Sequence, residues 1–440
     1  MDSARLNRIF TLALPIVAGM VSQNILNLVD TAMVGVLGNA ALAAVGIGGF
    51  VTFMCQALIL GISTGVQATV ARRKGEGLLD RAARTLNSAL LLVLIVGPIF
   101  SVVLTWLLPR TFHLLNGDPE VVAQALPYLD WRIMAITFVG MNFAFRGYWN
   151  ALDMSRIYMS TLVVMHISNI FFNWVLIFGH LGAPALGVEG AGIASAIAMV
   201  IGTATYMVLG MTHAREHGFM KGIGTRDEIV KLIRLSVPAG IQQFFFAAGF
   251  VATFWIIGKV GTAELAAANV LINIMLVALL PGLGLGLACS TLVGQAIGRG
   301  HPDDAYQWGW DVAKVAAVVM TTLGLPMLLT PDLVTMHFLH DPATRELARW
   351  PMRLVGMWMP IEALGFTMMH ALYGAGDSRR VMKISILFQW GLFLPAAYLV
   401  GPVLGFGLLG IWLMQGAYRI LQSMTFMRYW KFGGWRELVV

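Results

Sequence analysis

The chain has 440 residues, of which 58% are hydrophobic and only 12% are charged. A soluble globular protein carries about 25% charged residues, so this composition excludes a surface that faces water and indicates that the solvent is lipid. The formal net charge of +7 is by itself compatible with nucleic-acid binding, but its distribution along the chain argues against that role.

Long apolar stretches recur along the whole chain. A membrane-spanning helix needs about 20 apolar residues, so a chain of this length with short loops accommodates about twelve spans. Cys55 and Cys289 lie inside apolar stretches, which predicts neither a disulfide nor a metal site. We predict spans at residues 10–37, 43–70, 86–108, 123–149, 157–180, 189–211, 229–258, 264–294, 309–330, 347–373, 382–402 and 405–427.

The basic residues alternate between the two sides of these spans. Twenty of the 29 Lys and Arg residues lie in the terminal segments and in every second loop. The opposite loops hold only Arg110, Lys259, Arg345 and Arg349. This positive-inside pattern predicts a multi-pass protein of the bacterial inner (plasma) membrane with both termini in the cytoplasm. The basic charge therefore sets topology, and we expect no nucleic-acid partner.

The first span carries an acid. Gln23, Asn27 and Asp30 follow i, i+4, i+7 spacing and share one helix face, which predicts a polar stripe toward the bundle interior. An ionised carboxylate at this depth costs several kcal/mol unless it is paired. A carboxyl group that gains and loses a proton near neutral pH is what a proton-driven pump requires. The alternative is that Asp30 only hydrogen-bonds neighbouring helices together.

The fifth span carries three polar residues on one face. His166, Asn169 and Asn173 are separated by three and four residues. They are predicted to supply neutral partners for Asp30 or to line the same cavity. Hydrogen bonding between helices alone explains them equally well.

Polar residues also occur in the second half of the chain. Gln242 and Gln243 lie in the seventh predicted span and are candidates for lining a substrate path, with helix-to-helix hydrogen bonding as the alternative. Glu362 lies in the tenth span and is a second candidate for cation or proton coupling. Its alternative role is to pair with a nearby base, either Arg353 or Arg419.

The two halves repeat each other at an offset of 223 residues, with Pro15 matching Pro238 and Gly38 matching Gly261. Six spans per half insert both repeats in the same direction, which is a known transporter architecture. We therefore predict an all-α integral membrane fold of twelve transmembrane helices in two six-helix bundles. The predicted domains are an N-terminal lobe at 1–212, a cytoplasmic linker at 213–228 and a C-terminal lobe at 229–440.

Three segments form a recognisable set. They are Leu-Pro-Ile at 14–16 with Asp-Thr-Ala-Met-Val-Gly at 30–35, Asn-Ala-Leu-Asp-Met-Ser-Arg at 150–156, and Tyr-Gly-Ala-Gly-Asp-Ser-Arg at 373–379. Together with the doubled six-helix layout, these segments resemble the multidrug and toxic compound extrusion (MATE) family over nearly the whole chain. Within that family the chain is most similar to the DinF branch.

The resemblance implies a secondary antiporter that exports cationic or amphipathic organic molecules against inward proton or sodium flow by alternating access. It implies two helix bundles around a central cavity, no enzyme activity and no cofactor. The family works without ATP. The sequence agrees with this, since it contains no G-x-x-x-x-G-K-[ST] phosphate loop. Lipids are the expected surroundings, and the two-lobed design predicts a functional monomer.

Two departures from the family pattern bear on the coupling ion. In related transporters the position of Asn173 is often a second acid, and Glu362 matches an intramembrane acid used for cation binding in the NorM branch. That branch usually adds a Glu in the seventh span, where Phe246 stands here. With one carboxylate missing from each half, we expect protons as the coupling ion, and sodium is the alternative.

Three other functions fit the sequence less well. A lipid or polysaccharide-precursor flippase of the same superfamily is the runner-up, but few basic residues lie inside the spans to bind a large polar headgroup. An intramembrane enzyme would need paired catalytic groups, and His166 and His370 lie in different halves. A channel would need rings of charge or a filter motif, and neither is evident.

Overall fold

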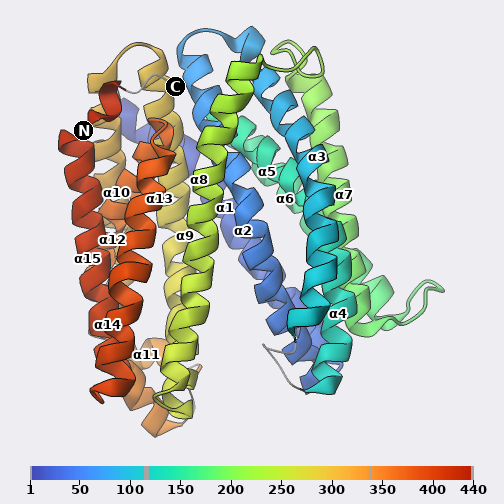
Figure 1. The fold of residues 1–440 in the computed structure, drawn as a ribbon, viewed down its shortest axis with the longest axis vertical. Helices are drawn as coiled ribbons and strands as arrows, with labels where there is room; N and C mark the ends of the chain where they lie inside the picture. The colour runs from blue at the N-terminus through green and yellow to red at the C-terminus, as the bar shows by residue number, and fades with distance from the viewer. Residues whose placement is uncertain (1, 113–117, 337, 340, 438–440) are drawn as a thin grey trace. The chain divides into compact units, whose positions relative to one another are not determined.

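The computed structural model describes residues 2–112, 118–336, 338, 339 and 341–437, and among these residues it contains helices and no strand. Figure 1 shows the helices in chain order. The first half contains α1 (Ser3–Gly35), α2 (Asn39–Gly75), α3 (Leu79–Thr111), α4 (Pro119–Met134), α5 (Ile136–Ala151), α6 (Ser155–Phe178) and α7 (Gly187–His213). The second half contains α8 (Arg226–Gly258), α9 (Thr262–Gly298), α10 (Pro302–Leu329), α11 (Pro331–Thr335), α12 (Pro342–Gly374), α13 (Ser378–Ile386), η2 (Leu387–Phe393), α14 (Leu394–Tyr398), η3 (Leu399–Val403), α15 (Gly407–Phe432) and η4 (Gly434–Glu437).

All twelve predicted spans correspond to helices of the described chain, so the predicted all-α fold is confirmed. Nine helices of the described residues are long and apolar enough to cross a membrane by length and composition. The remaining three predicted spans are the pair α4–α5, α12 and α15. The fourth span is not continuous, because Ala135 forms a turn between α4 and α5. The eleventh span runs through α13 to η3 and includes two π-helical stretches.

The internal repeat is visible in the helix boundaries. α1 and α8 both have 33 residues, and α2 and α9 both have 37. Gly77 and Gly300, which match at the repeat offset, both have positive φ angles of 77° and 79° in the turn that follows α2 or α9. Glycine suits these turns because a side chain disfavours that backbone conformation. The same local rules therefore end corresponding helices in both halves.

Matching caps also begin corresponding helices. Asp118 and Asp341 are the N-caps of α4 and α12, and each accepts a hydrogen bond from a backbone N–H of its helix. A proline follows each cap, at a position where the missing N–H would have no partner in the helix. Hydrogen bonds from the Thr344 hydroxyl and backbone N–H lower the pKa of Asp341, which keeps this cap ionised.

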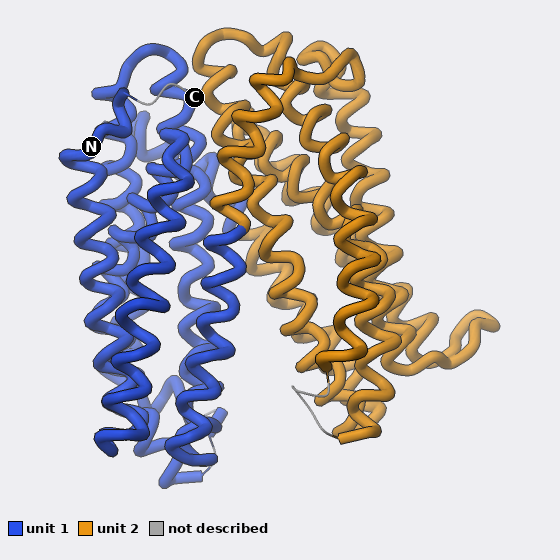
Figure 2. The backbone as a smooth tube through the Cα atoms, in the orientation of Figure 1, with its two compact units in different colours: residues 1–17, 241–440 blue, residues 18–240 orange. Residues whose placement is uncertain are grey.

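The chain forms two compact units whose boundaries fall inside helices (Figure 2). Unit 1 contains Met1–Val17 and Ile241–Val440, and unit 2 contains Ala18–Gly240. The first part of α1 therefore packs with the second half of the chain, and the first part of α8 packs with the first half. The predicted division into 1–212, 213–228 and 229–440 has a linker that runs from the last residue of α7 into the first turn of α8. It differs from these units and stays a prediction.

Small residues allow the first parts of α1 and α8 to pack closely with helices from the other half of the chain. In unit 2, a side chain at Gly61 of α2 would overlap the backbone of Ser236 and Gly240 of α8. In unit 1, Gly284 of α9 lies directly against Val17 of α1. Close backbone approach at small residues is the usual way in which membrane helices associate, because lipid removes the hydrophobic drive between them.

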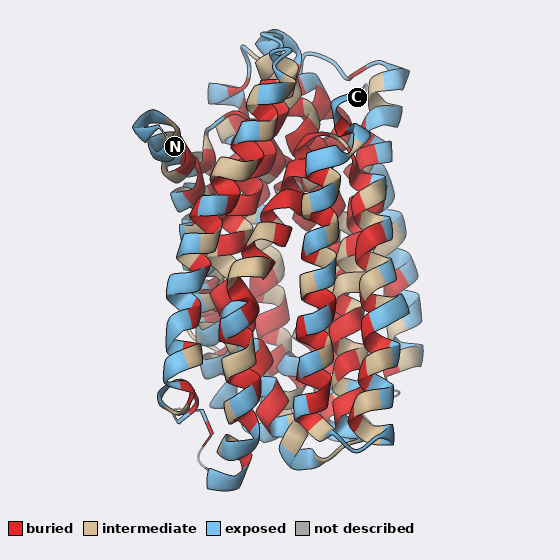
Figure 3. Cartoon of the chain, turned by 90° about the vertical axis from the view of Figure 1, so that its left-hand side faces the viewer, coloured by how far each residue is buried: buried red, intermediate tan, exposed pale blue. Residues whose placement is uncertain are grey.

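The outer surfaces of the helices are apolar. Figure 3 shows buried residues inside the helix bundles and exposed residues on their outer faces. Large exposed apolar side chains include Val102 on α3, Ile167 on α6, Val318 on α10 and Leu387 on η2. Exposed apolar area of this extent is characteristic of a surface in contact with lipid.

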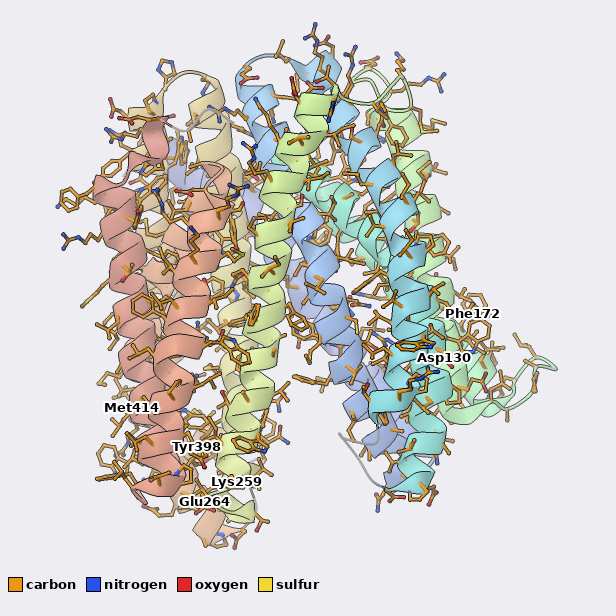
Figure 4. The ribbon with its side chains drawn as sticks, in the orientation of Figure 1. Asp130, Phe172, Lys259, Glu264, Tyr398 and Met414 are labelled. Atoms are coloured by element: carbon orange, nitrogen blue, oxygen red, sulfur yellow. The ribbon has the colours of Figure 1, made fainter. Side chains whose placement is uncertain are left out.

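The connection between α8 and α9 lies at one end of unit 1. Figure 4 labels Lys259 and Glu264 there, opposite the end at which both chain termini are marked in Figure 1. Lys259 belongs to the small set of basic residues that the charge pattern assigns to the loops away from the termini. The position of Lys259 in unit 1 agrees with that assignment.

Candidate coupling sites in the two units

Asp30 of α1 is bound by α6 of unit 2. The Asn173 side-chain N–H donates a hydrogen bond of 2.6 Å to Asp30 Oδ1. Asn173 is buried, while Asp30 is half-buried. The structure thus brings together two residues that the sequence had assigned to one site from two separate spans.

The Asn173 amide continues into a chain of polar contacts that reaches α7 and α4. Asn173 donates to Asn169 Oδ1 at 3.0 Å, and Asn169 donates to Ser195 Oγ at 3.3 Å. Arg132 of α4 approaches the same Ser195 oxygen at 3.5 Å and donates to the Tyr128 hydroxyl at 2.8 Å. The charge of Arg132 also acts on the Asp30 carboxylate through space. We call these six residues the Asp30 network.

Sequence reasoning missed three members of the Asp30 network, namely Tyr128, Arg132 and Ser195. The sequence could have indicated the role of Arg132, because a basic residue inside a predicted span needs a partner. Tyr128 and Arg132 are four residues apart and share a helix face. Asp130, labelled in Figure 4, lies between them in the sequence and therefore points from a different face of α4.

Gln23 and Asn27 are the other two residues of the predicted polar stripe on α1, and they differ in their surroundings. Nε2 of His166 donates a hydrogen bond to Gln23 Oε1 at 3.2 Å, which joins α6 to α1 one turn or more from Asp30. Gln23 donates in turn to Asn27 at 3.4 Å, but Asn27 is exposed. Gln23 and His166 therefore join α1 to α6 outside the Asp30 network, and among the described residues Asn27 makes no hydrogen bond to that network.

In unit 1, Glu362 is paired with Arg419. Arg419 Nε of α15 lies 3.3 Å from Glu362 Oε1 of α12, and the side chains are 6% and 2% exposed. The sequence left Arg353 and Arg419 open as partners of Glu362. Arg353 instead lies over the Trp350 ring at 5.0 Å, so Arg419 is the partner.

The other candidates of the second half have different surroundings. Gln242 is buried and accepts a hydrogen bond of 3.0 Å from the Tyr373 hydroxyl, which joins α8 to α12. Gln243 is half-buried. Among the described residues, no cluster of three or more His, Cys, Asp or Glu side chains could hold a metal ion.

The family model named MatE matches the chain twice, over residues 15–175 and 238–399. The chain belongs to the MATE family of transporters. The two matched segments begin at Pro15 and Pro238, which are the prolines that define the internal repeat. As a member of the MATE family, the protein is a membrane transporter and not an enzyme.

Curated relatives support the assignment to the MATE family. The probable multidrug resistance protein NorM of Thermotoga maritima is 27% identical, with 98% of this chain and 93% of that protein covered. The multidrug resistance protein PmpM of Pseudomonas aeruginosa is 27% identical, with 90% of this chain and 84% of that protein covered. The assignment of this chain to the DinF branch stays a prediction.

A solved MATE structure shares the fold of this chain. It is described as the outward-facing conformation of a multidrug resistance MATE family transporter of the MOP superfamily. The TM-score is 0.86 at 21% sequence identity, with 96% of this chain and 94% of that chain covered. This likeness agrees with the twelve-helix, two-bundle architecture.

Proposed function

We propose that this MATE family protein exports cationic or amphipathic organic compounds in exchange for protons, and that Asp30 carries the proton. The observation that carries the proposal is the Asp30 network, in which a half-buried carboxylate is held by the neutral amide of Asn173. The relatives NorM and PmpM are named as multidrug resistance proteins, which supports the substrate class. Alternating access supplies the transport cycle, as the family resemblance implies.

The Asn173 amide suits both protonation states of Asp30. Its N–H group donates to the ionised carboxylate. Its Oδ1 atom is buried and has no hydrogen-bond partner among the described residues. A protonated carboxyl needs an acceptor for its O–H, and a rotated amide supplies that acceptor from the same side chain. A second carboxylate at this position would instead raise the negative charge and favour a metal cation.

Because of Arg132, the net charge of the Asp30 network depends on whether Asp30 is protonated. An arginine keeps its positive charge at physiological pH. The network is therefore neutral when Asp30 is ionised and carries one positive charge when Asp30 is protonated. A positive site repels an organic cation, so proton uptake at Asp30 favours release of the substrate and proton loss favours its binding.

We further propose that the protein lies in the bacterial inner membrane with both termini in the cytoplasm. The support is the positive-inside charge pattern and the position of Lys259 in unit 1, away from the chain termini. With this orientation, protons that enter from outside protonate Asp30 while the site is open to the outside. The coupled movement of substrate is then outward.

Ethidium efflux with separately imposed gradients tests the coupling ion. Everted membrane vesicles that contain the wild-type protein are expected to accumulate ethidium when a pH gradient is imposed in sodium-free buffer. A sodium gradient with no pH gradient is expected to drive no accumulation, because the Asp30 network offers one carboxylate and a permanent positive charge. Accumulation driven by sodium alone would support the sodium-coupled alternative. No accumulation under either gradient would contradict multidrug export.

A further inference from the structure

Unit 1 contains a buried acid and a buried base that the Asp30 mechanism does not use. Glu362 and Arg419 lie on neighbouring helices, α12 and α15, with their charged groups 3.3 Å apart. An ion pair taken out of water is costly unless other groups complete its hydrogen bonds. Both members of this pair have buried polar atoms without a hydrogen bond among the described residues, namely Nε of Arg419 and both carboxylate oxygens of Glu362.

The guanidinium of Arg419 is surrounded by aromatic rings. Its Cζ atom lies 5.6 Å from the centre of the Phe246 ring of α8 and 5.1 Å from that of Tyr418. Both distances fall within the range in which a ring face attracts a cation. The cation is thus held by rings as well as by its acid.

The carboxylate of Glu362 has few partners. Neither of its oxygens makes a hydrogen bond within the described residues, although both are buried. Arg419 supplies the only ion pair to Glu362 that the described chain contains. A buried carboxylate with free lone pairs requires a cation close by, and here that cation is part of the chain.

We propose that Arg419 is a tethered cation that fills the place of an inorganic cation at Glu362. In consequence, the Glu362 carboxylate is neutralised without binding sodium, and the antiport proposed above depends on Asp30 alone. Arg419 is then the residue that determines which ion the protein responds to. Phe246 fits this assignment, because an aromatic ring accommodates a guanidinium where a second carboxylate would attract a free ion.

Removing the charge of Arg419 should expose a cation site. The Glu362 carboxylate would remain, and Gln415 lies one turn before Arg419 on the same buried face of α15. Carboxylate and amide oxygens are the ligands that hard cations prefer. The Arg419→Gln variant is therefore expected to bind sodium, which the wild type does not bind.

Sodium-dependent thermal stability of the purified full-length protein tests this directly. The melting temperature is measured in sodium chloride and in choline chloride at equal concentration. We expect no difference for the wild type or for Arg419→Lys, which keeps the charge. We expect Arg419→Gln to melt about 2 °C or more higher in sodium. The double variant Glu362→Gln/Arg419→Gln lacks the carboxylate and should lose this sodium response.

Two results would overturn the assignment of Arg419. One is a sodium response of the wild type that Glu362→Gln removes, since the carboxylate would then be open to sodium. The other is a folded Arg419→Gln variant that does not respond to sodium. If Arg419→Gln does not fold, Arg419→Ala is purified in sodium, guanidinium or choline chloride. Recovery only with sodium or guanidinium supports a cation site, and failure in all three while the double variant folds contradicts it.

The sodium measurement records binding and does not require transport. A sodium response confined to Arg419→Gln would support the tethered cation even if the wild type exported no ethidium. In that case the proposed export function would fail and the assignment of Arg419 would stand.

Discussion

Vesicles that contain Asp30→Asn are expected to lose ethidium accumulation driven by a pH gradient, down to the level of vesicles without the transporter. The asparagine has nearly the shape of the aspartate and can keep a hydrogen bond with Asn173, which lies 2.6 Å from Asp30 in the wild type. It cannot gain or lose a proton. The loss would therefore come from missing proton exchange and not from a missing contact.

Asp130→Asn is the matched control for this loss. Asp130 is a half-buried acid of α4 in unit 2, and it faces away from Tyr128 and Arg132. Its replacement should leave ethidium accumulation close to that of the wild type. Equal loss in both variants, or normal transport by Asp30→Asn at equal membrane abundance, would argue against Asp30 as the proton carrier.

Gly61→Ala is expected to destabilise the protein by about 3 kcal/mol, because it forces α2 and α8 apart within unit 2. A methyl group at Gly61 would lie 2.8 Å from Gly240 Cα and closer still to Ser236 O and Gly240 N. Backbone atoms cannot move aside as a flexible side chain can. The predicted result is a lower melting temperature and a lower yield of folded protein in detergent.

Gly46→Ala on the same helix provides the comparison. A methyl group at Gly46 meets nothing within 4 Å, and alanine is a better helix former than glycine by about 1 kcal/mol. This variant should be as stable as the wild type or slightly more stable. If Gly61→Ala and Gly46→Ala melt at the same temperature, close contact between α2 and α8 does not stabilise unit 2.

Much of the fold could be predicted from the sequence, because length and hydropathy determine where a chain can cross lipid. The turn at Ala135 and the unit boundaries at Val17 and Gly240 could not be predicted. These features depend on which helix packs against which glycine, as at Gly61 and Gly284. Hydropathy does not distinguish a glycine at a helix contact from one that faces lipid.

The candidate sites were predictable to a similar degree. The i, i+4 spacing of Asn169 and Asn173 placed them on one face, and the structure joins that face to Asp30. The contribution of Arg132 through Ser195 comes from helices far apart in sequence, so no local spacing indicates it. Likewise, the sequence offered two bases for Glu362, and only tertiary packing selects between them.

The most direct test of proton exchange through Asp30 is the release of protons on substrate binding. Purified protein in weakly buffered detergent solution is mixed with a saturating cationic dye, and the pH change is recorded. Near the pH at which Asp30 is half-protonated in the dye-free protein, the wild type should release up to about half a proton per dye bound, and Asp30→Asn should bind dye without release. Dye binding by the wild type with no proton release, or equal release by Asp30→Asn, would contradict proton coupling at Asp30.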